Sequence, residues 1–238
     1  MRRVSPPARW LTAALFITSL AFADSAPGAP AAPASADSAA RTPAADTAHA
    51  LPSGLELMHL VPPGQPPLET LEPENLGDLR DAFNAASDRV RVALLLSPSC
   101  PHCLHGADLI QKAFADSAST PLRVLVLWMH ITHSDRQPPN SLVLARVSDP
   151  RTIQWWDPHR LLSKVMQRDY PADTLIAMQD TTGTPPPVIW NLVAMWRPGV
   201  TWTDHLPLPD FSGHPIDENV GAFRRRLGEL SRGATRPK

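Results

Sequence analysis

The 238-residue sequence predicts an α/β protein with a central mixed sheet flanked by helices. Three observations support this fold class. Two largely apolar runs, Val90–Leu96 (apolar apart from Arg91) and Leu122–Trp128, have the composition of strands buried on both faces. Segments with apolar residues at helical spacing alternate with these runs. The region 188–230 predicts a β-hairpin and a closing amphipathic helix, so parallel units come first and antiparallel strands last.

The first residues predict an exported protein. Arg2, Arg3 and Arg9 accompany an apolar stretch, Leu11–Ala23, that ends in Ala-Phe-Ala. This pattern is typical of a signal peptide covering residues 1–23, with cleavage after its last alanine. A spanning helix needs about 20 apolar residues, so the stretch is short for a membrane anchor. An uncleaved anchor is the alternative, and only in that case would the membrane be a partner.

Composition then divides the rest of the chain. Residues 24–50 consist mainly of Ala, Pro, Ser, Asp and Thr, which predicts a disordered Ala/Pro-rich linker. Residues 51–235 are expected to form one folded domain. The formal net charge of −1 provides no basic surface, so we expect no nucleic-acid partner.

The first half of the domain predicts alternating strands and helices. Leu55–Leu60 alternates loosely and predicts a strand, and the prolines from Pro62 to Pro67 predict a loop after it. Apolar residues at helical spacing in Leu76–Phe83 predict a helix. The buried strand Val90–Leu96 follows, and apolar residues recur at helical spacing from Cys100 to Phe114.

The second half predicts a longer irregular region and then the antiparallel elements. After the strand Leu122–Trp128, we expect helices over Ser141–Arg146 and Pro158–Arg168. Val188–Trp196 and Val200–Trp202 flank Arg197-Pro198-Gly199 and predict a hairpin. Ile216–Leu230 has an apolar face and predicts the closing helix. The predicted order is β-α-β-α-β-α-β-β-α.

Trp155-Trp156-Asp157-Pro158 allows two interpretations. The paired tryptophans could line a binding surface near the cysteines. The interpretation we prefer is a loop that packs both rings on the core, with Asp157 as the N-cap of a helix beginning at Pro158.

The only two cysteines, Cys100 and Cys103, lie where a predicted strand meets a predicted helix. A helix N-terminus offers free N–H groups and a partial positive charge, and both stabilise a thiolate. Cysteines in such positions can have a pKa between roughly 3.5 and 7.5 instead of about 8.5. Residues three apart on a helix need only a small adjustment to form a disulfide. Pro101 suits the first helical turn because its missing N–H has no partner there.

The spacing predicts a division of labour in a redox pair. Cys100, at the start of the helix, is expected to be the attacking sulfur, and Cys103 is expected to resolve the mixed disulfide. His102 lies between them and would favour the Cys100 thiolate as a donor or as an imidazolium. These three are the candidate catalytic residues.

The segment Val92–Phe114, with its Cys-Pro-His-Cys sequence, resembles the active-site segment of the thioredoxin superfamily. The motif is similar to that of the DsbA-type periplasmic disulfide oxidases. The resemblance covers the predicted elements from Leu55 to Leu230, although only about 25 residues around the motif match specifically. It implies a thioredoxin-like fold and thiol–disulfide exchange, with Cys100 and Cys103 in the redox roles.

Members of that superfamily carry a cis-proline just before the strand that faces the disulfide. In this sequence, a five-residue strand before the Arg197-Pro198-Gly199 turn puts Asn191 at that position, and a longer strand puts Pro187 there. We favour Pro187. If Asn191 occupies the position, substrate binding by that loop is in doubt.

The sequence therefore predicts a thiol–disulfide oxidoreductase without a cofactor, periplasmic or secreted. Its partners would be cysteine-containing exported proteins and a redox-recycling partner. The alternative is a soft-metal (copper or zinc) binding protein or metallochaperone on the same fold. The residues available for metal binding would be Cys100, His102, Cys103 and His105, with His130 and His133 as a second pair. A third possibility is a redox-inert interaction module.

Overall fold

The computed structural model describes residues 58–179, 184 and 186–234. The predicted signal peptide, residues 1–23, and the predicted linker, residues 24–50, lie outside the described residues. No helix among the described residues combines the length and the apolar composition that crossing a bilayer requires.

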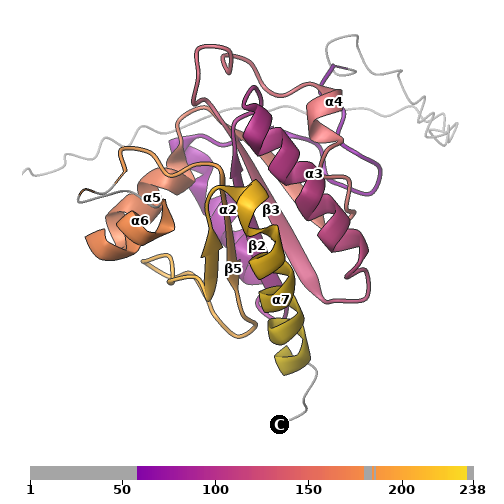
Figure 1. Ribbon diagram of the computed structural model, residues 1–238. Helices are drawn as coiled ribbons and strands as arrows, with labels where there is room; N and C mark the ends of the chain where they lie inside the picture. Colours follow the sequence, from indigo (N-terminus) through magenta and orange to yellow (C-terminus); the bar gives the residue numbers. More distant parts are fainter. Residues whose placement is uncertain (1–57, 180–183, 185, 235–238) are drawn as a thin grey trace, which may run out of the picture. The chain divides into compact units, whose positions relative to one another are not determined.

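The described residues form an α/β structure with six strands and helices on both faces of the sheet (Figure 1). The strands are β1 Glu69–Thr70, β2 Val90–Leu96, β3 Leu122–Met129, β4 Thr152–Asp157, β5 Leu192–Trp196 and β6 Phe211–Gly213. The helices are the 3-10 helix η1 Pro73–Asn75 and the α-helices α2 Leu76–Ala85, α3 Pro101–Ala115, α4 Ser141–Leu144, α5 Leu161–Asp169, α6 Ala172–Met178 and α7 Ile216–Ala234.

The sheet is mixed and has the strand order β1-β4-β3-β2-β5-β6. β1 to β4 pair in parallel, whereas β5 pairs antiparallel with both β2 and β6. The predicted fold class, an α/β arrangement with a central mixed sheet flanked by helices, is confirmed. The parallel unit β2-α3-β3 places the cysteines at its strand-to-helix junction, and the antiparallel strands and closing helix come last.

The core has two layers because β2 and β3 are buried on both faces, as their apolar runs predict. Ala93 and Leu95 of β2 belong to the layer that includes α2, α5 and α6. Val92, Leu94 and Leu96 belong to the layer that includes α3 and α7. These two helices lie side by side (Figure 1). The layer between the sheet, α3 and α7 is therefore the one that positions the cysteine pair.

Two strand predictions are wrong. Residues 58–60 of the predicted strand Leu55–Leu60 are not extended, and residues 55–57 lie outside the described residues. The first strand is instead β1, which pairs with Trp155 and Trp156. The predicted hairpin strand Val200–Trp202 is a loop, and β5 pairs with β6 after a longer connection. β4 and α6 were not predicted.

The paired tryptophans lie in β4 and not in a loop. Trp155 packs into the α2 layer and Trp156 into the α3 layer, so the prediction that both rings pack on the core is confirmed. The helix after them begins at Leu161, three residues later than predicted. The buried carboxylate of Asp157 still accepts hydrogen bonds from the amides of Leu161 and Leu162, at 2.8 and 3.3 Å, and so caps that helix from a distance.

Candidate functional site

The two cysteines lie at the carboxyl end of β2, where the chain turns into α3. Cys100 occupies the N-cap position of α3, and Pro101 is the first helical residue. The backbone N–H of Cys103 donates a hydrogen bond to Sγ of Cys100 at 3.5 Å. A sulfur thus stands where a side-chain oxygen usually caps a helix, beside N–H groups that have no partner within the helix.

The two thiols have different environments. Cys100 is partly exposed, whereas Cys103 is completely buried, and neither forms a disulfide in this structure. Burial raises the pKa of the Cys103 thiol far above its ordinary value. The nearby Cys100 sulfur and the Asp135 carboxylate raise this pKa further, and a backbone hydrogen bond from Ser97 opposes them. The reduced pair therefore has one accessible sulfur and one that is held as a buried thiol.

A buried aspartate fixes the turn that precedes Cys100. Asp135 follows β3 and is 1% exposed. Its carboxylate accepts hydrogen bonds from the Ser97 hydroxyl at 2.8 Å and from the Ser99 amide at 3.0 Å. It also accepts from the amides of Ile131 and Thr132. Burial alone would raise the pKa of Asp135, but these hydrogen bonds lower it, so the group stays ionised. Sequence analysis missed this residue because an aspartate in a polar loop carries no distinguishing signal.

His102 lies on the exposed side of the first turn of α3. Its Nδ1 is 3.0 Å from Oδ2 of Asp217, in the first turn of α7. The His102 side chain is 76% exposed and that of Asp217 is 15% exposed. The structure thus brings all three predicted site residues to one helix start. Within the described residues, the hydrogen bond of the His102 ring goes to a carboxylate and not to a cysteine.

Asn191, and not Pro187, precedes the strand that faces the cysteines. β5 is five residues long and begins at Leu192, so the preference for Pro187 is wrong. Asn191 has a left-handed backbone with φ of 50° and is 5% exposed. The one cis peptide bond among the described residues is His214–Pro215. Since Leu192 is paired with Leu95, Asn191 lies beside the end of β2, the strand that leads to Cys100.

The predicted metal ligands do not form a three-ligand site in the part of the chain that the structure describes. Cys100, His102, Cys103 and His105 occupy one helix start, while His130 and His133 lie in the loop after β3. Over residues 58–179, 184 and 186–234, no three His, Cys, Asp or Glu side chains lie close enough together to hold a metal ion. Zinc sites in proteins take three or four such ligands, so the described residues do not provide one. Two thiolates can still bind Cu(I), a soft cation.

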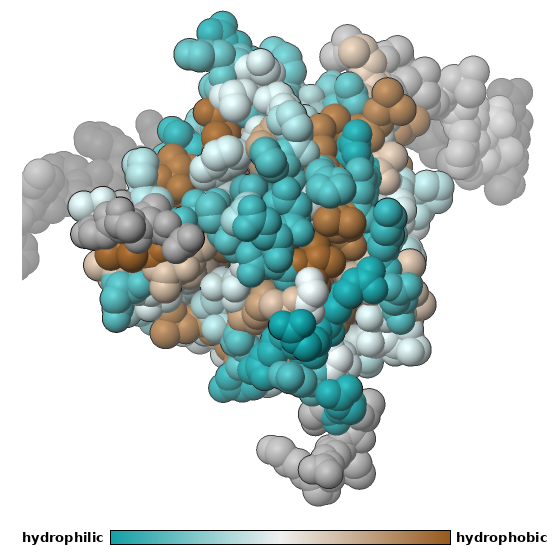
Figure 2. All heavy atoms as spheres, in the orientation of Figure 1, coloured by the Kyte–Doolittle hydropathy of each residue, from teal (hydrophilic) through white to brown (hydrophobic). Residues whose placement is uncertain are grey.

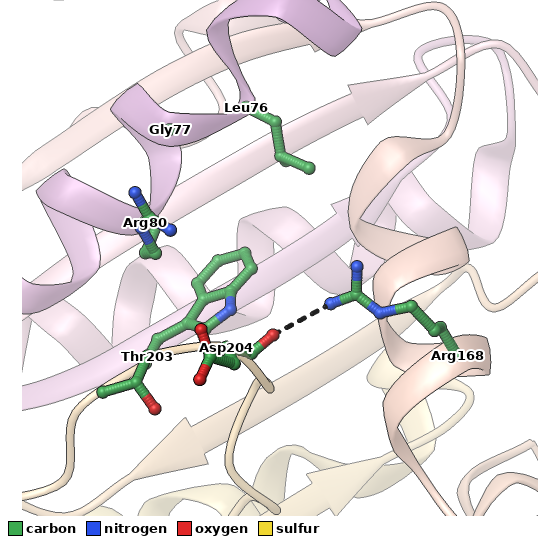
Figure 3. Close-up of a pocket in the computed structure, with 7 residues that line it drawn as sticks. Leu76, Gly77, Arg80, Arg168, Thr203 and Asp204 are labelled. Atoms are coloured by element: carbon green, nitrogen blue, oxygen red, sulfur yellow. Dashed lines mark hydrogen bonds between the residues drawn. The ribbon is translucent and has the colours of Figure 1, made fainter. Parts of the chain in front are cut away.

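A hollow of about 290 Å³ lies away from the cysteines (Figure 3). It is lined by α2, by Arg168 of α5 and by the segment 202–204. The Arg168 guanidinium already binds both carboxylate oxygens of Asp169 and the carbonyl of Asp204. Because α2 and α5 cover the opposite face of the sheet from α3 and α7, this hollow has no part in the cysteine site.

Comparison with known proteins provides a single weak similarity. No model of a protein family matches the chain, and no curated protein matches it. One solved structure, described as the solution structure of a putative thioredoxin from Neisseria meningitidis, is 17% identical. The match covers 64% of this chain and 81% of that one, with a TM-score of 0.33. Overlap of this size does not identify a family, so the fold class rests on the strand order and helix placement described above.

Proposed function

We propose that this protein is an exported thiol–disulfide oxidoreductase of the thioredoxin-like type, with Cys100 and Cys103 as its redox pair. The observation that carries the proposal is the asymmetry of the two sulfurs. One is partly exposed at a helix N-cap, and the other is buried one turn later with its N–H directed at the first. Such an arrangement suits a nucleophile and a resolving thiol, which need different access and different thiolate content.

The exchange involves two steps. The Cys100 thiolate attacks a disulfide of the partner, forming a mixed disulfide and releasing one partner sulfur as a thiolate. The Cys103 sulfur then attacks Sγ of Cys100, loses its proton to the released thiolate or to water, and displaces the second partner sulfur. Two electrons pass from the cysteine pair to the partner disulfide. The reverse sequence oxidises a partner dithiol, and a second disulfide-bearing or dithiol protein would reset the pair.

The surface beside Cys100 suits a polypeptide substrate. A hollow of about 170 Å³ adjoins Ser99 and is bordered by Pro98, Pro138, Pro139 and Val143. Leu142 of α4 precedes the lining residue Val143 and is 82% exposed, and Figure 2 shows hydrophobic side chains around the place that α4 occupies in Figure 1. A chain bonded through its cysteine to Cys100 could lay apolar residues here. Cysteine-containing exported proteins in the periplasm or outside the cell are the proposed substrates, because a disulfide persists in those compartments.

The test is a redox titration of the purified domain. The protein is equilibrated with mixtures of reduced and oxidised glutathione, quenched in acid and analysed by intact mass. We expect one reversible two-electron transition, and we expect catalysis of disulfide formation or reduction in a model substrate. The Cys100→Ser, Cys103→Ser double variant is the control and should show neither. A wild-type protein that forms no intramolecular disulfide over the whole range would refute the proposal. Metal analysis of the same sample tests the metal alternative.

A further inference from the structure

Asp217 lies in the first turn of α7, 114 residues after Cys103 in the sequence, and contacts the redox motif. One carboxylate oxygen lies 3.0 Å from Nδ1 of His102. The other, Oδ1, is buried and has no hydrogen-bond partner among the described residues. Because one oxygen of this carboxylate is shielded from water, the hydrogen bond to its other oxygen contributes more to stabilising the negative charge. The imidazole of His102 forms that hydrogen bond.

A glycine explains how α7 approaches so closely. Gly106 lies four residues after His102, on the same face of α3. A Cβ at Gly106 would lie 2.9 Å from side-chain atoms of Ile216 and 3.4 Å from the amide nitrogen of Asp217. No residue with a side chain fits there without moving the start of α7. Ile216 is itself fully buried, so the position of its neighbour Asp217 is fixed by core packing.

We propose that Asp217 is a positioning residue of the redox centre, acting through His102; this rests on the proposed thiol–disulfide exchange. A carboxylate can only accept, so the bond requires the proton on Nδ1 of the neutral ring. Nε2 then becomes the nitrogen that gains or loses the proton. The Asp217 charge increases the imidazolium population, and the imidazolium favours the Cys100 thiolate, which stabilises the reduced pair and makes the protein a stronger oxidant.

The same carboxylate has a second, opposite effect. Its negative charge disfavours a nearby thiolate directly, across a longer distance. The other titratable groups within one turn along the chain are Cys103 and His105 on α3, and His214 and Glu218 near Asp217, while the Asp135 carboxylate faces Cys103 from the loop after β3. The two effects of Asp217 have opposite signs, and only the one that acts through the imidazole needs His102. Removing His102 should therefore reverse the effect of neutralising Asp217.

The experiment uses Asp217→Asn in two backgrounds, with Glu218→Gln as the matched control. Glu218 is the next residue in the same helical turn and is exposed, so its variant removes the same charge without touching His102. Imidazole protonation is measured by NMR in a Cys100→Ser, Cys103→Ser background, where no redox function is needed. The equilibrium constant for oxidation by glutathione is measured with both cysteines present, in the wild type and in His102→Gln.

We expect Asp217→Asn to lower the ratio of protonated to neutral His102 by about twofold to fivefold, the size that partly exposed ion pairs produce. The disulfide should become more stable in the wild-type background and less stable in the His102→Gln background. Asp217→Glu should restore part of the protonation, and Glu218→Gln should change little. Unchanged His102 protonation, or an effect of the same sign in both backgrounds, would overturn the inference. If glutathione does not oxidise the wild-type cysteine pair, the proposed function is refuted, but the measured effect of Asp217 on His102 protonation remains valid.

Discussion

The two sulfurs should differ strongly in reactivity, and this can be measured without knowing a substrate. The reacting species is the thiolate. Burial raises the pKa of Cys103, and each unit of such a rise lowers the thiolate fraction tenfold. Cys103 is also fully buried, so a reagent reaches it only after local opening, whereas Cys100 is partly exposed. We expect Cys100 to be alkylated at least about 100-fold faster at pH 7, the factor that two such units produce.

The assay treats the reduced protein with limiting iodoacetamide and quantifies the two modified cysteines by peptide mass spectrometry. Because the cysteines are three residues apart, fragment spectra are used to assign the site. The companion experiment compares two variants in an oxidising compartment. Cys103→Ser should accumulate reductant-sensitive mixed disulfides with exported proteins, and Cys100→Ser should accumulate far fewer. Equal alkylation rates, or faster modification of Cys103, would refute the assignment of roles and the packing argument behind it.

Three further predictions concern stability and processing. Asp169→Asn should lower the free energy of unfolding by about 2 kcal/mol at pH 7, because its buried carboxylate accepts from Arg168, His205 and the Leu206 amide. Hydrogen bonds, above all the one from Arg168, lower the pKa of Asp169 in the folded protein. Its contribution to the free energy of unfolding is therefore complete above the unfolded pKa of about 3.9 and is lost as the pH falls below that value. Urea denaturation of both proteins should show a smaller difference in stability at pH 2 than at pH 7. Arg91→Met should lower the free energy of unfolding by about 3 kcal/mol or more by the same method, because the fully buried guanidinium donates to five backbone carbonyls, of which only those of Ala86 and Ser87 keep an amide donor among the described residues; Arg91→Lys should rescue little. Intact mass of the exported protein should show cleavage after Ala23, and a mature chain that begins at Met1 would mean an anchored protein.

The elements that could be predicted from the sequence are those specified by their own residues. Val90–Leu96 was predicted to the residue because a run that is apolar on both faces, apart from Arg91, has few other structures available. α3 was predicted because its apolar spacing is regular and Pro101 marks its start. The place of the cysteine pair at the start of α3 followed from both, because it requires only knowing where the strand ends and the helix begins.

The elements that were predicted wrongly or missed contain polar groups whose hydrogen-bond partners lie far away in the sequence. β4 contains Gln154, fully buried, whose side chain accepts from Nε1 of Trp128 and donates to Gln65 and to two carbonyls. A glutamine between apolar residues does not indicate a buried strand unless those partners are known. Trp202 was predicted to lie in a strand, but the Asn84 side chain supplies both of its backbone hydrogen bonds, and no second strand is needed there.

In the candidate site, too, the local residues could be predicted from the sequence and the distant ones could not. Its reactive atoms come from four consecutive residues, but the groups that fix and charge them come from elsewhere in the chain. Asp135 holds the turn before Cys100 through Ser97 and Ser99, and Asp217 reaches the ring of His102 only because α7 packs on Gly106. Identical Cys-Pro-His-Cys motifs can therefore have different redox properties in different proteins. If this chain carries out the proposed exchange, its redox properties should depend on how the start of α7 packs against α3, because that packing holds Asp217 at the ring of His102.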